Sequence, residues 1–206
     1  MRIITISREF GSGGRELGKR LADALGFDYY DKEIVTAVAE SMSLDENYLR
    51  GVLRKGIASQ IPITFSNTLS GSTDFSAQNS KILAKQSSII REIADKGDCV
   101  IVGRSADAIL TEYDPFSIFV YADIDSRIAR CKARATEDEQ MTDKQWKKKI
   151  KHIDKTRAKN YDILAPTSWG DMHSYKLCVD VTNTEIKSLV PAVAEYAKIW
   201  FEKNGK

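Results

Sequence analysis

The chain has 206 residues, of which 42% are hydrophobic, and this is enough to bury the core of one soluble domain. Thirty-one basic residues against 29 acidic ones give a net charge of +2, so the overall charge does not indicate a nucleic-acid partner. Three separated cysteines lack the spacing of a disulfide framework or a C-x-x-C metal site. No apolar run approaches the roughly 20 residues that span a bilayer, and no charged-then-apolar leader opens the chain. We therefore expect a cytoplasmic protein without a membrane partner.

The first predicted element, residues 3–6, is an apolar, β-branched run typical of a strand buried on both faces of a parallel sheet. A glycine-rich turn follows at residues 11–14, and leucines then recur every four residues from Leu17 to Leu25, before Gly26. Strand, glycine turn and helix in this order predict a phosphate-binding loop. Glycines let backbone N–H groups face an anion, and the helix dipole adds positive charge.

The middle of the chain alternates further helices and strands. Residues 56–76 interrupt this pattern, because they are rich in Ser, Thr and Gly, and we expect a long mobile loop that orders over a ligand. The other predicted elements are a strand at 27–30, helices from 31 and at 43–54 and 77–96, and strands at 99–102 and 116–121.

Arginines mark the helix expected at residues 123–133. Arg127, Arg130 and Arg134 lie three and four residues apart, so they share one helix face. We expect at least one of them to reach a phosphate group and the others to be solvated.

The last part of the chain predicts two helices and a strand. Thr142 and Gln145 form a capping box at the start of a lysine-rich helix, whose lysines we interpret mainly as a solvated face. A strand is expected at 176–181, followed by a helix at 186–200. Pro191 should kink that helix or mark its real beginning, since proline inside a helix costs about 3 kcal/mol.

Strands that alternate with helices predict a parallel α/β sheet with helices on both faces. Ligands of such sheets bind beyond the carboxyl ends of the strands. Three of the predicted strands end near one another on this interpretation. We therefore expect residues 11–15, Arg104 and Arg127 to converge on one cleft.

The glycine turn itself matches neither of two standard nucleotide-binding patterns. G-x-x-x-x-G-K-[ST] can be laid on Gly13 to Lys19, but position 20 is arginine, and that register puts the lysine more than one turn inside a helix. The dinucleotide pattern G-x-G-x-x-G fails because Glu16 stands where the third glycine belongs. Glycine turns also occur for packing alone, so phosphate binding and packing remain alternatives for this turn.

Longer stretches resemble the cytidylate kinases, and more closely the cytidylate-kinase-like group, among the P-loop nucleoside monophosphate kinases. The resemblance covers nearly the whole chain. The stretches that carry it are ISREFGSGGRELGKRLA, YYDKE, VIVGRSAD, FVYADIDSRIARCKAR, the D-x-x-R of Asp154 and Arg157, and residues 176–183. Arg91 also lies 13 residues before Arg104, the interval between the corresponding family arginines. The resemblance implies a three-layer P-loop NTPase fold of the α/β class with a five-stranded parallel sheet. It implies one domain over residues 1–206, with a mobile acceptor-binding region at about 31–80 and a helical lid at about 134–172.

The resemblance also implies ATP-dependent phosphoryl transfer, with Mg²⁺, to a nucleoside monophosphate such as CMP or to another small phosphate acceptor. Asp31, Arg91 and Arg104 are the implied acceptor-binding residues, although Asp31 alone is also compatible with a helix cap. Asp154 and Arg157 belong to the implied lid, although their spacing also suits an ion pair between them. The implied catalytic residues are Arg15, Arg130, Asp154 and Arg157, and the implied ATP-binding residues are Gly11, Ser12, Gly13, Gly14, Arg15, Glu16 and Arg127.

Two departures from the family pattern fall on the chemistry. Gly14 stands where the phosphate-loop lysine is expected, and Glu16 stands where a Ser or Thr holds magnesium. Neutralising phosphate charge is most of the catalytic work of phosphoryl transfer. We therefore expect Arg15 to replace the lysine, with Arg8 and Lys19 behind it.

Two alternatives to a kinase remain. One is a nucleotide-binding sensor or partner-binding protein of the same fold, and the altered loop favours it. The other, nucleic-acid binding through the lysine-rich helix, is weak because no aromatic stacking platform accompanies the lysines. The pattern leaves the oligomeric state open.

Overall fold

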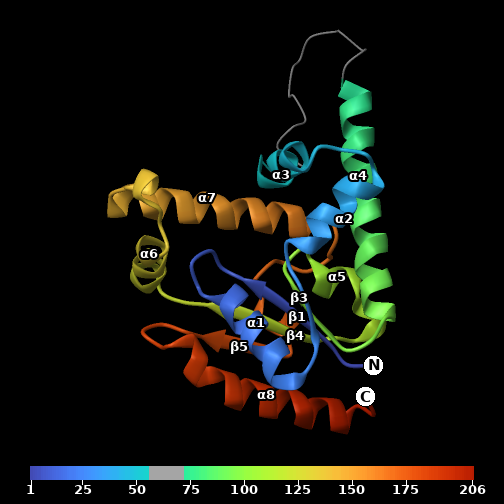
Figure 1. The fold of residues 1–206 in the computed structure, drawn as a ribbon, viewed down its shortest axis with the longest axis vertical. Helices are drawn as coiled ribbons and strands as arrows, with labels where there is room; N and C mark the ends of the chain where they lie inside the picture. Colours follow the sequence, from blue (N-terminus) through green and yellow to red (C-terminus); the bar gives the residue numbers. More distant parts are fainter. Residues whose placement is uncertain (56–71) are drawn as a thin grey trace.

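Five parallel strands form one sheet in the order β2-β3-β1-β4-β5 (Figure 1). The computed structural model describes residues 1–55 and 72–206, and it confirms the predicted five-stranded parallel sheet of the α/β class. The strands are β1 (Ile3–Arg8), β2 (Asp28–Tyr30), β3 (Cys99–Val102), β4 (Phe116–Tyr121) and β5 (Leu177–Asp180). β1 therefore continues two residues beyond the predicted run, and Arg8 is paired in register with Val120 of β4.

Helices cover both faces of the sheet (Figure 1). One face packs against α1 (Gly14–Leu25) and α8 (Ile186–Lys203). The other packs against α2 (Glu33–Ser41), α3 (Glu46–Lys55), α4 (Ser72–Asp95) and α5 (Ala106–Ile109). Beyond the carboxyl ends of the strands lie α6 (Ile124–Ala133) and α7 (Asp143–Asp162), which pack on each other. Three short 3₁₀ helices complete the described chain, at Thr111–Tyr113, Glu137–Glu139 and Met172–Ser174.

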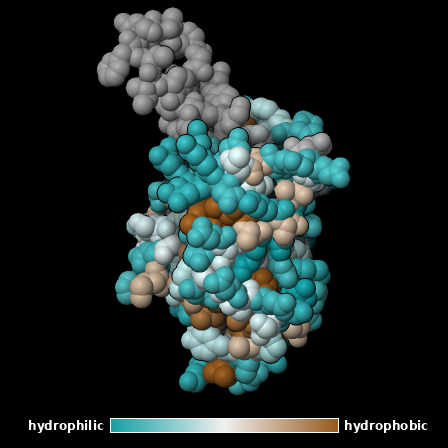
Figure 2. Space-filling view, turned by 90° about the vertical axis from the view of Figure 1, so that its left-hand side faces the viewer, coloured by the Kyte–Doolittle hydropathy of each residue, from teal (hydrophilic) through white to brown (hydrophobic). Residues whose placement is uncertain are grey.

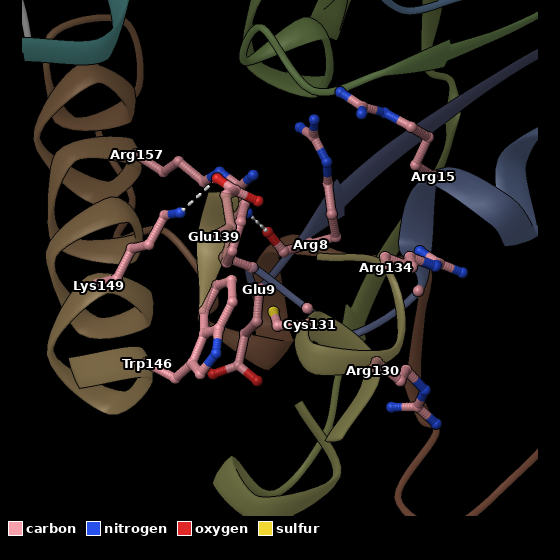
Figure 3. Close-up of a pocket in the computed structure, with 13 residues that line it drawn as sticks. Arg8, Glu9, Arg15, Arg130, Cys131, Arg134, Glu139, Trp146, Lys149 and Arg157 are labelled. Atoms are coloured by element: carbon pink, nitrogen blue, oxygen red, sulfur yellow. Dashed lines mark hydrogen bonds and ion pairs between the residues drawn. The ribbon is translucent and has the colours of Figure 1, made fainter. Parts of the chain in front are cut away.

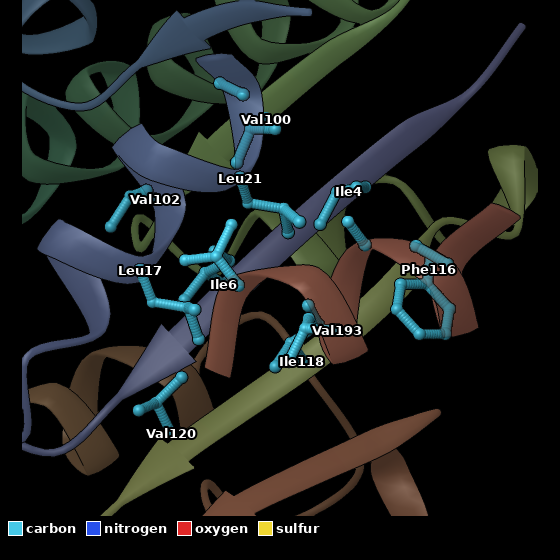
Figure 4. Packing of buried hydrophobic residues seen from close by; sticks show 14 of the residues in the cluster. Ile4, Ile6, Leu17, Leu21, Val100, Val102, Phe116, Ile118, Val120 and Val193 are labelled. Carbon is cyan, nitrogen blue, oxygen red and sulfur yellow. The ribbon is translucent and has the colours of Figure 1, made fainter. Parts of the chain in front are cut away.

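Alternate residues of β1 serve the two cores. Ile4 and Ile6 belong to the cluster under α1 and α8, where Leu17 and Leu21 pack against them (Figure 4). Ile3 belongs to the cluster under α2 and α4. Successive side chains of a strand point to opposite faces, so one apolar run supplies both layers. This double burial holds β1, and the turn after it, in a fixed position at the centre of the sheet.

The structure bears out the capping box and revises two other predictions. Thr142 caps α7 through the Gln145 amide, and the Gln145 side chain accepts from the Thr142 amide. Of the loop expected at 56–76, residues 72–76 belong to α4, and the remainder lies outside the described residues. Pro191 does not mark the start of α8, which begins at Ile186. The carbonyl left without a donor by the proline belongs to Lys187, an exposed residue whose backbone water can reach. Among the described helices, none is long and apolar enough to cross a membrane.

Candidate phosphate-binding site

The turn between β1 and α1, residues 9–13, leads into a helix start with free backbone donors. Gly11 and Gly13 adopt left-handed φ angles of 81° and 88°. The first hydrogen bond within α1 runs from the Leu17 amide to the Gly13 carbonyl at 3.0 Å, and no side chain caps the helix. The amides of residues 14–16 therefore have no acceptor within the helix, and an arrangement of this kind suits a phosphate anion.

The glycines of this turn are also required by packing. A Cβ atom on Gly11 would lie 2.8 Å from the carbonyl oxygen of Arg127, and one on Gly13 would lie 2.7 Å from Cδ1 of Ile186. The turn is thus pressed against α6 on one side and α8 on the other. The two alternatives for the turn are compatible, since packing explains the missing side chains and leaves the amides available.

A buried arginine holds the outer part of the turn. Arg127 of α6 is 6% exposed, and its Nε donates to the Phe10 carbonyl at 2.8 Å. Its Nη1 lies 3.0 Å from the Glu9 carboxylate, and its Nη2 pairs with Asp154 of α7. Asp154 in turn accepts from the Phe10 amide at 2.7 Å. Arg127 and Asp154 are therefore bound to the turn itself, and they fix its shape from outside.

Arg157 reaches the turn from the same helix as Asp154. Its Nη1 donates to the Arg8 carbonyl at 2.8 Å and lies 3.6 Å from Oδ1 of Asp154. The guanidinium also lies over the Phe10 ring, 5.5 Å from its centroid. The ion pair suggested by the spacing of Asp154 and Arg157 is present, but each partner also contacts the turn.

Asp31 is a buried carboxylate surrounded by arginines. It is 4% exposed; Nε of Arg15 lies 2.5 Å from its Oδ2, and Nη2 of Arg8 lies 3.9 Å from its Oδ1. The cap position of α2 is held by Lys32 without a side-chain hydrogen bond, so the helix-cap alternative for Asp31 is wrong. A carboxylate so enclosed orients the arginines that it contacts.

Arg104 completes a group that we call the arginine cluster, namely Arg8, Arg15, Arg104 and Arg157. It follows β3, and both Arg104 and Ser105 adopt left-handed φ angles, of 63° and 52°. Such conformations are uncommon outside glycine and gather at functional sites. The Arg104 carbonyl accepts from Nε2 of Gln86 on α4 at 3.3 Å, which helps to hold this backbone.

The charges of the cluster act on one another. Burial, together with the positive charges of Arg8 and Arg15, lowers the pKa of Arg104 to about 10, against the opposing effect of Asp31. Burial likewise lowers the pKa of Arg157 to about 9, with Arg8 and Arg15 again adding to the effect. Positive charge held this closely and partly buried favours an anion in the space between the guanidinium groups.

A cavity of about 250 Å³ opens beside the turn, between α6 and α7 (Figure 3). Figure 3 shows Arg8, at the end of β1, and Arg15, in the first turn of α1. Arg157 and Lys149 face them from α7. Lys149 also pairs with Glu139 at 3.1 Å. Cationic side chains form much of the lining: Arg8, Arg15, Arg130, Arg134, Lys149 and Arg157. The surface around α6 and the start of α7 is mainly hydrophilic, with apolar residues in separate patches (Figure 2).

The other α6 arginines bind protein groups on different sides. Arg130 donates from Nη2 to the carbonyls of Val181 and Thr184, the latter at 3.0 Å, while its Nη1 is buried and has no partner among the described residues. Arg134 is exposed and pairs with Glu16 at 2.5 Å. Like Arg127, each of them contacts protein atoms rather than solvent alone.

Ser12 and Arg91 are two further predicted site residues, and the structure places them differently. Ser12 is fully buried within the turn, and its Oγ donates to the Glu9 carbonyl at 2.9 Å. Arg91 is exposed on α4 near Tyr113, and the structure places it apart from the arginine cluster. The sequence signal for Arg8 was its position at the strand end before the turn, but its central place among the arginines was not foreseen.

The described residues do not form a magnesium site by themselves. No group of three or more His, Cys, Asp or Glu side chains suited to a metal occurs in the described ranges. Glu16, in the place of the metal-binding Ser or Thr, pairs with Arg134 and also with Arg20, at 3.0 Å. Mg²⁺ is commonly held by one or two carboxylates together with substrate phosphates and water, so a kinase does not require a complete set of protein ligands for it.

Comparison with known protein families identifies the family of this chain. A family model described as the cytidylate kinase-like family matches residues 3–183. The chain belongs to the cytidylate kinase-like family. None of the curated proteins matches it.

Several solved structures share the fold of this cytidylate kinase-like chain. An uncharacterised protein from Eubacterium ventriosum matches with a TM-score of 0.69 and 24% identity, over 96% of this chain and 99% of that chain. A shikimate kinase from Bacteroides thetaiotaomicron matches with a TM-score of 0.59 and 14% identity, over 96% and 98%. A gluconokinase from Sinorhizobium meliloti matches with a TM-score of 0.51 and 17% identity, over 98% and 94%. At identities this low, the structural matches establish the fold alone. They confirm the predicted P-loop fold.

Proposed function

We propose that this cytidylate kinase-like protein transfers the γ-phosphoryl group of ATP to a nucleoside monophosphate such as CMP, or to another small phosphate-bearing acceptor. The observation that carries the proposal is the meeting of free α1 amides with the arginine cluster at the carboxyl end of the sheet. The amides come from one helix and the arginines from four segments of the chain. The kinase fold supports phosphoryl transfer in general.

Residues 11–14 would hold the donor phosphates through their backbone, with Glu16 and Arg134 closing one side. ATP supplies the γ-phosphoryl group: an acceptor oxygen bonds to phosphorus, the bond to the β,γ-bridging oxygen breaks, and ADP leaves with that electron pair. Arg127 and Asp154 act as positioning residues, because their contacts fix the turn. The charge normally supplied by the P-loop lysine has two candidate sources, Arg15 and Arg8.

Asp31 and Arg104 lie on the acceptor side of this arrangement. Arg104 offers a planar fork that binds two phosphate oxygens, and Asp31 orients Arg15 towards the same space. Residues 31–80, of which 56–71 are outside the described part, would form the acceptor side of a single domain. Residues 134–172 would form the lid, with Arg157 carried towards the transferred group. Arg91 is retained as an acceptor-binding prediction, although its exposed position on α4 gives it no contact with this cluster.

The proposal is tested by ADP formation with ATP, Mg²⁺ and a panel of acceptors, namely the nucleoside monophosphates and small phosphorylated metabolites. We expect one acceptor to raise ADP formation well above the acceptor-free rate. Arg104→Met should lower that rate strongly, and Lys198→Met, at an exposed lysine of α8 outside the arginine cluster, serves as the comparison. A panel without any acceptor-dependent ADP would contradict the proposal.

A second candidate function is a nucleotide sensor without turnover, because Glu16 is engaged by two arginines and position 14 carries no lysine. Calorimetry of nucleotide binding, combined with a single-turnover assay of phosphoryl transfer, distinguishes the two functions. Nucleotide binding with no single-turnover transfer to any acceptor would favour the sensor, whereas a single turnover that depends on Arg104 would exclude it.

A further inference from the structure

The side chain of Arg8 follows a path that two glycines make possible. A Cβ atom on Gly14 would lie 2.6 Å from Cβ of Arg8 and 2.9 Å from its Cγ. Gly14 is the first residue of α1 and is not among the residues with positive φ. Glycine is therefore needed at position 14 for space rather than for backbone conformation, and the space is filled by the stem of Arg8.

The guanidinium of Arg8 rests against a second glycine. A Cβ atom on Gly103 would lie 1.8 Å from Nη1 of Arg8 and 2.7 Å from its Cζ. Gly103 lies at the end of β3, the strand that neighbours β1 in the sheet. The side chain of Arg8 thus crosses the start of α1 and places its charge over the end of β3, with 16% of the side chain exposed.

The packing of Arg8 against Gly14 can be compared with the alignment of this turn to the phosphate-loop pattern. When Gly13 is laid on the second glycine of G-x-x-x-x-G-K-[ST], the first glycine falls on position 8 and the lysine on position 14. This chain has arginine at 8 and glycine at 14, so the cation and one glycine have exchanged places across the turn. The contact between Arg8 and Gly14 shows that the two changes depend on each other sterically.

We propose that Arg8, rather than Arg15, supplies the phosphate-neutralising charge of the missing lysine, and that Gly14 is the matching half of this exchange. The proposal deepens the proposed function and rests on it. The two arginines differ in freedom: the Arg15 side chain is 55% exposed and its Nε is engaged by Asp31 at 2.5 Å. Arg8 is anchored on a central strand, its Nη2 is 3.9 Å from Asp31, and it lines the cavity beside the free amides. A fixed guanidinium of this kind binds two phosphate oxygens with little loss of side-chain entropy.

The test compares variants that separate charge from packing. Arg8→Met keeps a stem over Gly14 and removes the charge, and Arg8→Lys keeps the charge as a single ammonium. Arg15→Met is the matched control for the neighbouring cation. The double variant Arg8→Gly with Gly14→Lys restores the first glycine and the lysine of the usual pattern, and Arg8→Gly alone is its reference. Each variant is assayed for binding of inorganic tripolyphosphate by calorimetry, for ADP formation, and for folding by urea denaturation.

We expect Arg8→Met to lose about 100-fold in ADP formation and to bind tripolyphosphate much more weakly, since one donor to developing charge contributes on this scale. Arg8→Lys should retain part of both, and Arg15→Met should lose about 10-fold or less. The double variant should recover at least about 10-fold over Arg8→Gly. A residue with a purely structural role would not be replaced by a lysine on the other side of the turn.

Three outcomes would overturn the proposal: unchanged tripolyphosphate affinity in Arg8→Met, a larger loss in Arg15→Met, or a folded double variant no better than Arg8→Gly. The same set separates the two levels of inference. Tripolyphosphate binding that depends on Arg8, in a protein that phosphorylates no acceptor, would contradict the proposed function and support the role of Arg8 in phosphate binding. A wild-type protein that binds neither tripolyphosphate nor ATP would overturn both.

Discussion

The arginines of α6 and those of the arginine cluster differ in the partners that surround them. Each α6 arginine bonds to carbonyl or carboxylate oxygens of the protein, and Arg127 bonds to three such groups. In the cluster, Arg8 and Arg15 share one buried carboxylate, that of Asp31, and other guanidinium groups lie close by. Arg127, with three buried protein acceptors, stabilises the fold, whereas Arg8, among like charges, is available to an anion. Residue type and spacing do not distinguish the two cases.

The comparison predicts its largest effect at Arg127. Arg127→Met should reduce the free energy of unfolding by about 3 to 5 kcal/mol, because it removes the buried cation that pairs with Glu9 and Asp154 and the donor to the Phe10 carbonyl. Urea denaturation followed by circular dichroism measures this loss. Arg134→Met is the matched control on the same helix, and its exposed pair with Glu16 predicts a change below about 1 kcal/mol. Equal losses in the two variants would remove the distinction between the buried and the exposed α6 arginine.

For Arg104 we expect a large effect on activity and a small effect on stability. Arg104→Met is expected to lower ADP formation by about 100-fold, because it removes a phosphate-facing cation. The same change should leave the free energy of unfolding unchanged within about 1 kcal/mol, or raise it, because it relieves repulsion from Arg8 and Arg15. Steady-state kinetics and urea denaturation on one preparation test both halves. A variant that is destabilised as strongly as Arg127→Met would place Arg104 with the structural arginines.

The smallest effect expected is a pH dependence at Arg157. Burial lowers its pKa to about 9 from an ordinary value of 12.5, so the folded state releases this proton at lower pH than the unfolded chain does. Between these two values the unfolded state binds more protons, and the contribution of this group to stability therefore rises with pH. Tripolyphosphate affinity should fall over the same range, because the bound anion loses a cation.

Calorimetry at pH 7.5 and pH 9.5 measures this change, with Arg157→Met as the control that lacks the titrating group. The wild-type affinity should decrease more than that of the variant between the two pH values. If both decrease equally, other groups account for the pH dependence, and Arg157 does not contribute a titrating charge to the site.

Local patterns predicted the fold well. The buried strands, the glycine turn and the capping box of Thr142 are written in neighbouring residues, whose periodicity and turn chemistry act over a few positions. The prediction was less accurate where an element depends on distant packing. β1 runs on to Arg8 because β4 pairs with it there, and no local pattern reports that pairing.

The site was predicted in part. The turn, Arg15, Asp31, Arg104 and Arg157 were selected from the sequence, and the structure brings them together. Arg91 was selected because its distance from Arg104 in the chain matches the family interval. The structure places it apart from the other site residues, at an exposed position of α4. The interval from Arg91 to Arg104 leaves α4 and crosses the whole of β3, so it does not specify which part of the sheet Arg91 lies near.

By itself, the sequence determined the order of strand, glycine turn and helix, and with it the phosphate-binding prediction, because apolar periodicity and glycine conformation are local properties. The tertiary structure decided which partners surround each arginine. Position 14 lacks a side chain because Arg8 passes over it, and Arg8 ends against Gly103, a residue 95 positions away in the chain. Contacts over such distances arise only when the strands pair and the helices pack, so the exchange between positions 8 and 14 becomes visible only in the folded protein.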